Sequence, residues 1–399
     1  MLKLSDRSYR MPASPIRRLV PLADDAKRRG IKVYHLNIGQ PDLPTPQVAI
    51  DAIKNWEPQV IEYTNSAGME SYRRGLTQYY KKHGIELDYT DILITAGASE
   101  GLFFTFMTIF NPGDEVIIPE PFYTNYNSIA LEADVKIVPI TTKIENGFAL
   151  PDIEEFEKRI TDRTKAILIC NPNNPTGALY PQKELEQLRD LAIKHNLWII
   201  ADEVYREFVY DGQKHFSVMH LSGIEDRVVL IDSNSKRYSQ CGTRVGYLIS
   251  KNKEFIKLAL KYAMARLSPP YFGQIIGEAS LKTPQSYFDQ VYNEYIKRRD
   301  FLINALNQME GVFAPKPHGA FYTIARLPID DSDKFCEWML SDFNYNGETV
   351  MMAPATGFYA TPGLGKDEVR LAYVLKVEDL EKAMNILDIA LKKYPGRTV

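Results

Sequence analysis

Five short apolar runs recur between about residues 90 and 250, each followed by turn-forming residues and then by a stretch with helical spacing. The runs are continuously apolar rather than alternating, which is typical of strands covered on both faces by helices. In an intervening stretch such as Gln182–His195, leucines recur at helical spacing. This alternation predicts an α/β fold with a doubly wound, mostly parallel sheet. The five runs are residues 91–95, 115–118, 165–169, 197–201 and 227–232.

The two ends of the chain have a different pattern. Residues 1–45 are rich in Pro, Arg and Asp and show no strong strand, whereas residues 285–399 alternate helix-like and strand-like stretches. At 399 residues the chain exceeds one ordinary core. We therefore expect a large domain over residues 46–284 with a seven-stranded sheet. A smaller α+β domain would combine residues 1–45 with residues 285–399.

Composition narrows the class of protein. The net charge is −3, so no large basic field is available for nucleic acid or an anionic membrane. The three cysteines show no CxxC spacing, which argues against a metal site and suits a reducing compartment. The first residues are too polar for a signal peptide, and the most apolar stretch, Leu102–Phe110, is far shorter than the roughly 20 residues that span a bilayer. We expect a cytoplasmic protein without a metal.

Residues with chemical potential follow the predicted strands, and open α/β sheets bind ligands at the carboxyl ends of their strands. The first run ends in Gly97-Ala98-Ser99, whose small residues at a helix start suit a phosphate, although a tight turn would look the same. The third ends in Asn171–Gly177, with three Asn and two Pro, which is either a turn or a rigid polar site.

Two further strand ends carry charged residues. Asp202 follows a buried run, where a carboxylate is costly unless it meets a cation; the ordinary alternative is an aspartate that caps a helix. Tyr205 lies three residues later, so both side chains could face one ligand on an opening helical turn. The last run ends in Ser233-Asn-Ser-Lys236, with Arg244 nearby, which combines an amine nucleophile with an anion pocket. A surface lysine is the ordinary alternative for Lys236 taken alone.

Together these segments resemble fold-type I pyridoxal-phosphate enzymes, in particular the class I and II aminotransferases. The resemblance covers nearly the whole chain, and its motifs occur in the order found in that family. Asn234 and Arg237 depart from the residue types that are common within the lysine motif. The matching segments are residues 37–42, 171–177, 202–205, 233–236, 242–246, 317–322 and 369–371.

The resemblance implies a role for each matching position. Lys236 would hold pyridoxal phosphate as a Schiff base and, once released, carry a proton. Asp202 would pair with the pyridine nitrogen, while Tyr205 and Asn174 would bond the ring oxygen. The other implied cofactor ligands are Gly97, Ala98, Ser99, Tyr123, Ser233, Ser235 and Arg244, with Tyr63 reaching the phosphate from the partner subunit of a homodimer.

The substrate would be held by Arg370, which resembles the residue that clamps the α-carboxylate, together with Asn174 and the backbone of Gly39. Ser99 stands where some relatives selective for aspartate carry a lysine. Arg266 could supply that positive charge instead, or it could be an ordinary surface or interface arginine. Cys241, five residues after the lysine, has no assigned role.

The predicted function is ping-pong transamination, with aspartate as the favoured amino donor, aromatic amino acids next, and a 2-oxo acid such as 2-oxoglutarate as acceptor. One alternative is another reaction of the same fold, such as β-elimination, because the cofactor performs the difficult step. A cofactor-binding regulator is the other, although the chain carries no appended basic DNA-binding module.

Overall fold

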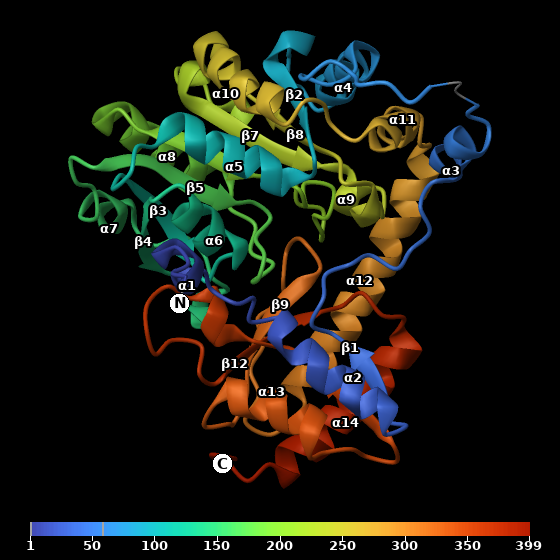
Figure 1. The fold of residues 1–399 in the computed structure, drawn as a ribbon. Coiled ribbons are helices and arrows are strands. Elements are labelled where there is room, and N and C mark those ends of the chain that lie inside the picture. The colour runs from blue at the N-terminus through green and yellow to red at the C-terminus, as the bar shows by residue number, and fades with distance from the viewer. Residues whose placement is uncertain (1, 58–59) are drawn as a thin grey trace.

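A computed structural model describes residues 2–57 and 60–399 of the chain. Its main feature is a seven-stranded sheet with the order β2-β8-β7-β6-β5-β3-β4 (Figure 1). β8 runs antiparallel to β2 and β7, and the other neighbours are parallel. The predicted α/β class and seven-stranded, mostly parallel sheet are confirmed. The strands are β2 (Ile92–Thr95), β3 (Glu115–Glu120), β4 (Lys136–Thr141), β5 (Thr164–Cys170), β6 (Trp198–Asp202), β7 (Val228–Ser233) and β8 (Gly246–Ile249).

Successive side chains of each inner strand enter two different cores. In β5, Ala166 and Leu168 pack with residues of one group of helices, while Ile167 and Ile169 pack with residues of another. This is why the runs are continuously apolar: both faces of the sheet are covered. The first face carries α5 (Ala98–Ile109), α6 (Asn125–Glu132) and α10 (Lys253–Ala265), and the second carries α4 (Glu70–Lys82), α7 (Ile153–Glu157) and α8 (Gln182–His195).

The two ends of the chain meet in a second, smaller unit (Figure 1). β1 (Lys32–His35) pairs in parallel with β10 (Glu348–Met351), a strand in the region 1–45 where the sequence pattern showed no strong one. A second sheet has the order β11-β12-β9. The boundaries at residues 45/46 and 284/285 stay predictions. The other elements here are β9 (Tyr322–Arg326), β11 (Ala353–Pro354), β12 (Glu368–Ala372), α2 (Val20–Arg28), α13 (Ser332–Ser341) and α14 (Val377–Lys393).

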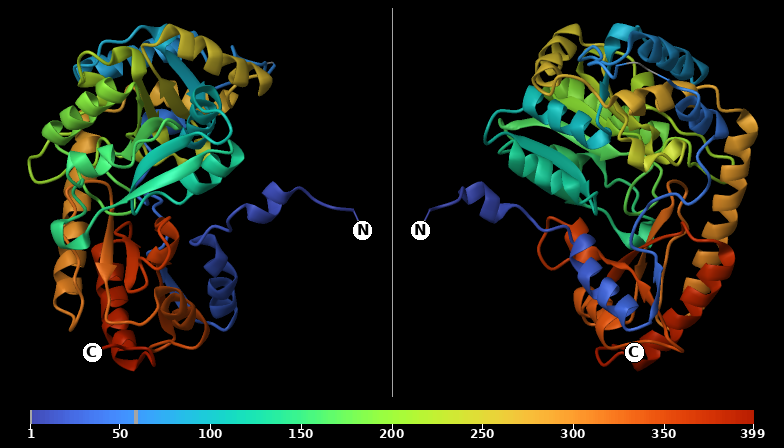
Figure 2. Two further views of the ribbon diagram at one scale, coloured as in Figure 1. Left: turned by 90° about the vertical axis from the view of Figure 1, so that its left-hand side faces the viewer. Right: turned by 45° about the vertical axis from the view of Figure 1, so that its right-hand side comes forward.

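Further helices connect the units or stand at their margins. α12 (Gln285–Asn307) runs from the large unit down along the small one (Figure 1). α3 (Gln47–Lys54) packs against α11 (Tyr271–Ser280). Residues 2–5 extend away from the body of the molecule (Figure 2), whereas α1 (Asp6–Arg10) is tied to the large unit by an ion pair between Arg7 and Asp134.

Among residues 2–57 and 60–399, none of the helices is both long and apolar enough to cross a bilayer. The same residues contain no group of three or more His, Cys, Asp or Glu side chains placed to hold a metal ion.

Candidate active site

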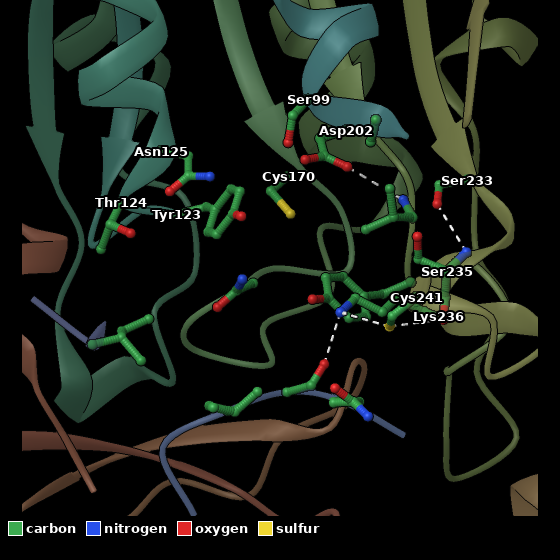
Figure 3. Close-up of a pocket in the computed structure, with 18 of the residues that line it drawn as sticks. Ser99, Tyr123, Thr124, Asn125, Cys170, Asp202, Ser233, Ser235, Lys236 and Cys241 are labelled. Atoms are coloured by element: carbon green, nitrogen blue, oxygen red, sulfur yellow. Dashed lines mark hydrogen bonds between the residues drawn. The ribbon is translucent and has the colours of Figure 1, made fainter. Parts of the chain in front are cut away.

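The carboxyl ends of β5, β6 and β7 and the start of α5 open into a cavity of about 640 Å³ (Figure 3). Side chains from the small unit close its other side. Among the described residues that line it, four are basic and only Asp202 is acidic. This imbalance suits anionic ligands. The four basic side chains belong to Arg17, Lys236, Arg244 and Arg370.

Lys236 reaches the cavity from a short helix that follows β7. This helix, α9 (Asn234–Arg237), is capped by Ser233, whose hydroxyl accepts a hydrogen bond from the Ser235 backbone N–H at 2.9 Å. The Lys236 Nζ donates to the Gly39 carbonyl oxygen at 2.7 Å. Its Nζ also lies 3.8 Å from the Cys241 Sγ (Figure 3). The amine is thus held in the cavity by one carbonyl, in reach of a bound ligand.

Asp202 is the last residue of β6 and faces the same cavity. Its carboxylate accepts a 2.8 Å hydrogen bond from the Tyr126 hydroxyl and a 3.4 Å one from the Val204 backbone N–H. Burial raises its pKa to about 6, because the interior opposes an uncompensated negative charge. A cationic group bound opposite this carboxylate would reverse that rise.

The segment after Asp202 is a turn and not the opening of a helix, which corrects that expectation. The Arg206 N–H donates to the Glu203 carbonyl at 3.0 Å, and the Phe208 N–H to the Tyr205 carbonyl at 2.8 Å. Tyr205 still enters the cavity, where its hydroxyl lies 2.8 Å from that of Tyr322. Burial holds the pKa of Tyr205 well above its ordinary value.

Arg370, on β12, is a buried guanidinium with incomplete partners. One terminal nitrogen donates to Asn174 Oδ1 at 3.0 Å and the other donates to the Asn37 carbonyl. Within the described chain its Nε has no hydrogen-bond partner. The rings of Tyr322 and Phe358 lie 4.6 and 4.8 Å from the guanidinium carbon. A buried charge without an anionic partner is costly, so this position suits a carboxylate ligand.

The opposite end of the cavity is built from the start of α5 and from Arg244. Gly97 precedes α5 with a φ of 83°, and a Cβ there would lie 2.2 Å from the nearest Arg244 nitrogen. The guanidinium of Arg244 donates to the Cys241 and Ala96 carbonyls at 3.0 and 3.3 Å. Free N–H groups at a helix start next to an arginine suit a phosphate.

Most predicted site residues line this cavity, but three do not. Gly97 lies behind Arg244 without lining it. The Tyr63 side chain is 78% exposed in the single chain and lies away from the lining. Arg266 pairs with Glu100 at 3.3 Å and donates to the Ile94 carbonyl, so its charge is already neutralised outside the cavity. The predicted residues that do line it are Gly39, Ala98, Ser99, Tyr123, Asn174, Asp202, Tyr205, Ser233, Ser235, Lys236, Arg244 and Arg370.

The structure also adds residues that the sequence did not assign to the site. Tyr126, on α6, does not line the cavity but donates a hydrogen bond to the Asp202 carboxylate at 2.8 Å, and in the sequence it cannot be told from an ordinary core tyrosine. Asn37 and Tyr322 lie in segments 37–42 and 317–322, which carry the family resemblance, so the sequence could have pointed to them. No sequence signal points to Arg17. The remaining lining residues without an assigned role are Ser14, Ile16, Ile38, Gln40, Leu102, Thr124, Asn125, Cys170, Val204 and Cys241.

The chain has a doubly wound sheet, with a buried carboxylate and a lysine at the carboxyl ends of its strands. This arrangement is typical of α/β enzymes that act on anionic ligands. Comparison with known proteins agrees. The family described as aminotransferase class I and II matches residues 31–387. The chain belongs to this family, and the predicted aminotransferase activity is confirmed.

Individual relatives match over nearly their full length. The aspartate aminotransferase of Pyrococcus horikoshii is 32% identical, over 98% of this chain and 97% of that protein. The aromatic-amino-acid aminotransferase 2 of Thermococcus litoralis is also 32% identical, over 98% and 99%. The solved Thermus thermophilus aspartate aminotransferase with maleate is 29% identical, has a TM-score of 0.89, and matches over 98% of this chain and 100% of that one.

Proposed function

We propose that the chain binds pyridoxal phosphate and transfers the amino group of L-aspartate, its favoured donor, to a 2-oxo acid such as 2-oxoglutarate. The observation that carries this proposal is the convergence of Lys236, Asp202 and Arg370 on one cavity. An amine, a buried carboxylate and a guanidinium with a free nitrogen are the groups that such a reaction needs. Aspartate aminotransferases and an aromatic-amino-acid aminotransferase among the relatives support aspartate first and aromatic donors second.

The residues fit the cofactor at both of its ends. Arg244, Ser233 and Ser235 would hold the phosphate with the N–H groups that begin α5, and a side chain at Gly97 would displace Arg244. At the other end, Asp202 would hold the ring nitrogen in its protonated form, because its buried carboxylate lacks a cationic partner. Pyridoxal phosphate, when bound, supplies an electron sink for negative charge at the substrate α-carbon.

Around that ring, the side chains have separate tasks. Tyr123 lines the cavity and would stack on the ring face, as the resemblance implies. Tyr205 and Asn174 would donate hydrogen bonds to the ring oxygen. In this arrangement Asn174 also holds Arg370 through its side-chain oxygen, which links the cofactor position to the substrate position.

Lys236 is placed to move a proton. Its Nζ is held at 2.7 Å by the Gly39 carbonyl, and the neighbouring Cys241 Sγ donates to the Ser235 carbonyl at 3.2 Å. An amine tethered in this way can take a proton from the substrate α-carbon and return it, provided that it is uncharged when it acts.

Arg370 is expected to set the affinity for every substrate, because all of them carry an α-carboxylate. Arg370→Lys keeps the charge but removes the paired nitrogens, so kcat/KM for donor and acceptor should fall by about 10- to 100-fold. Steady-state kinetics with aspartate and 2-oxoglutarate measure the effect. The matched control is Arg326→Lys on the neighbouring strand β9. Arg326 pairs with Glu145 at the surface, so this substitution should change kcat/KM little.

The active unit in this proposal is a homodimer in which Tyr63 reaches the phosphate of the partner subunit. The 78% exposure of the Tyr63 side chain in the single chain supports this arrangement, since the residue is free to contact another copy. The molar mass in solution, measured by light scattering, tests it. A monomer that retains full activity would contradict it.

Transfer of labelled nitrogen tests the proposed reaction itself. Aspartate labelled with ¹⁵N and unlabelled 2-oxoglutarate should give ¹⁵N-glutamate, detected by mass spectrometry, with oxaloacetate formed in equal amount. A β-elimination enzyme would instead release ammonia and pyruvate from a suitable donor without any acceptor. Labelled ammonia in place of labelled glutamate would therefore reject transamination of aspartate.

A further inference from the structure

One of the four basic side chains of the cavity has no task in the reaction described so far. Lys236, Arg244 and Arg370 are assigned to the proton, the phosphate and the α-carboxylate. The fourth is Arg17, the first residue of the short 3₁₀ turn Arg17–Leu19. Within the described residues, its guanidinium makes no ion pair and no side-chain hydrogen bond. By contrast, the adjacent Arg18 points elsewhere and pairs with Asp333 and, at 3.3 Å, with Glu337.

The segment that carries Arg17 is fixed beside the substrate position. Pro15 packs on Gly357 so closely that a Cβ there would lie 2.3 Å from the proline ring. Gly357 belongs to the turn Ala355–Phe358, whose last residue places its ring 4.8 Å from the guanidinium carbon of Arg370. On its other side, Leu19 is buried in the core of the small unit. These contacts hold Arg17 at the cavity on the same side as Arg370.

The positive charges of Arg370 and Arg17 both act on Tyr123, which lines the same cavity. Burial raises the pKa of Tyr123 to about 12, and the positive charges of Arg370 and Arg17 act against that rise. Arg370 is expected to hold the α-carboxylate and Lys236 and Arg244 have other tasks, which leaves Arg17 as the basic side chain of the described lining that is available to a second carboxylate. Asn125 and Ser14 line the cavity as further polar groups.

We propose that Arg17 binds the side-chain carboxylate of dicarboxylic substrates and so sets the preference for acidic amino acids. The inference rests on the proposed transamination and names its specificity-determining residue. The other positions considered for this charge do not supply it: Ser99 is neutral, and Arg266 is neutralised by Glu100 outside the cavity. A carboxylate would give Arg17 the charge-assisted partner that it lacks.

An exposed guanidinium also explains how uncharged donors can be accepted. The Arg17 side chain is solvated at the mouth of the cavity, so an aromatic donor does not bury an unpaired charge. Aromatic donors do not form the ion pair with Arg17, but their binding leaves the Arg17 guanidinium in solvent and therefore costs little free energy. The preference for dicarboxylic over aromatic substrates should therefore come from tighter binding of the dicarboxylates. This preference should disappear when Arg17 loses its charge.

The test compares Arg17→Gln with Arg18→Gln in the holoenzyme. We expect Arg17→Gln to lower kcat/KM for aspartate by about 10- to 100-fold while kcat/KM for phenylalanine changes by less than about 3-fold. Arg17→Lys, which keeps a cation, should recover part of the aspartate activity. Arg18→Gln should change neither value, because its charge pairs away from the cavity. Equal losses with both donors, or an unchanged aspartate value, would overturn the proposal.

A binding measurement separates this inference from the proposed reaction. Titration calorimetry with succinate and propionate compares a dicarboxylate with a monocarboxylate and requires no turnover. Arg17→Gln should weaken succinate by about 10- to 100-fold and leave propionate unchanged. If the wild-type enzyme transferred no amino group but showed this difference, the transamination proposal would fail and the role of Arg17 would stand. Equal affinities for succinate in wild type and Arg17→Gln would reject it.

Discussion

Lys236→Ala is expected to lower the rate of amino transfer by about 10⁴-fold, the upper range for removal of a positioned general base. The substitution removes the only amine of the cavity among the described residues and the hydrogen bond to the Gly39 carbonyl. Single-turnover experiments with bound cofactor measure the loss directly. Because Lys236 is only half-buried, the thermal unfolding temperature should change little.

A second lysine serves as the control for that result. Lys261→Ala alters an exposed residue of α10 on the far side of the large unit, and its activity should match that of the wild type. Loss of less than about 10-fold in Lys236→Ala would show that another group moves the proton. A large drop in thermal stability would mean that the loss reflects misfolding and would require Lys236→Arg as the comparison.

Asp202→Asn is expected to lower kcat by about 10²- to 10³-fold and yet to stabilise the apoprotein above pH 6. The amide can still accept the hydrogen bond from Tyr126, so the local fold should persist. It cannot supply the negative charge that keeps a bound ring nitrogen protonated. Activity and stability should therefore change in opposite directions, which a general packing defect would not produce.

The pH dependence of that stabilisation follows from the raised pKa. The native apoprotein binds the Asp202 proton up to about pH 6, whereas an unfolded chain releases it near the ordinary pKa of 3.8. Stability contributed at this site is thus fully present at low pH and is lost as the pH rises toward 6. Asp202→Asn removes that loss, on the order of 2 to 3 kcal/mol at pH 8.

Denaturant unfolding of the apoproteins at pH 4.5 and pH 8 measures this difference. At pH 8 Asp202→Asn should be the more stable by the full difference of about 2 to 3 kcal/mol, and at pH 4.5 by only about a third of it, because pH 4.5 lies just above the unfolded pKa of 3.8 and below the native pKa of about 6. Asp190→Asn, an exposed position on α8, should show no pH-dependent difference. A variant less stable than wild type at pH 8 would contradict the buried, uncompensated charge.

The sequence predicted the inner strands because each is buried on both faces and hence continuously apolar. It did not identify β4, whose side chains are mostly half-buried at the sheet edge and which contains Pro139. β8 was not predicted because it has only four residues and begins with Gly246, the glycine that ends the Arg244 motif. β1 depends on a partner more than 300 residues away, at β10, and no local pattern reveals such a pairing.

Site prediction succeeded where a residue follows a buried strand, as Asp202 and Lys236 do, because sheet topology alone brings such positions together. It had no means of finding Arg17, which follows no strand. The position of Arg17 depends on the packing of Pro15 against Gly357, a contact between opposite ends of the chain. The sequence also left undecided whether the charge of Arg266 reaches the cavity, since only the structure shows its pairing with Glu100.

Covalent attachment of the cofactor to Lys236 is the claim on which the proposed chemistry depends. It can be tested by treating the holoenzyme with borohydride, digesting it, and locating the modified peptide by mass spectrometry. We predict that the reduced pyridoxyl group is found on Lys236 and that prior incubation with aspartate prevents its attachment. Modification of a different lysine, or of none after reconstitution with pyridoxal phosphate, would contradict the assignment of this site.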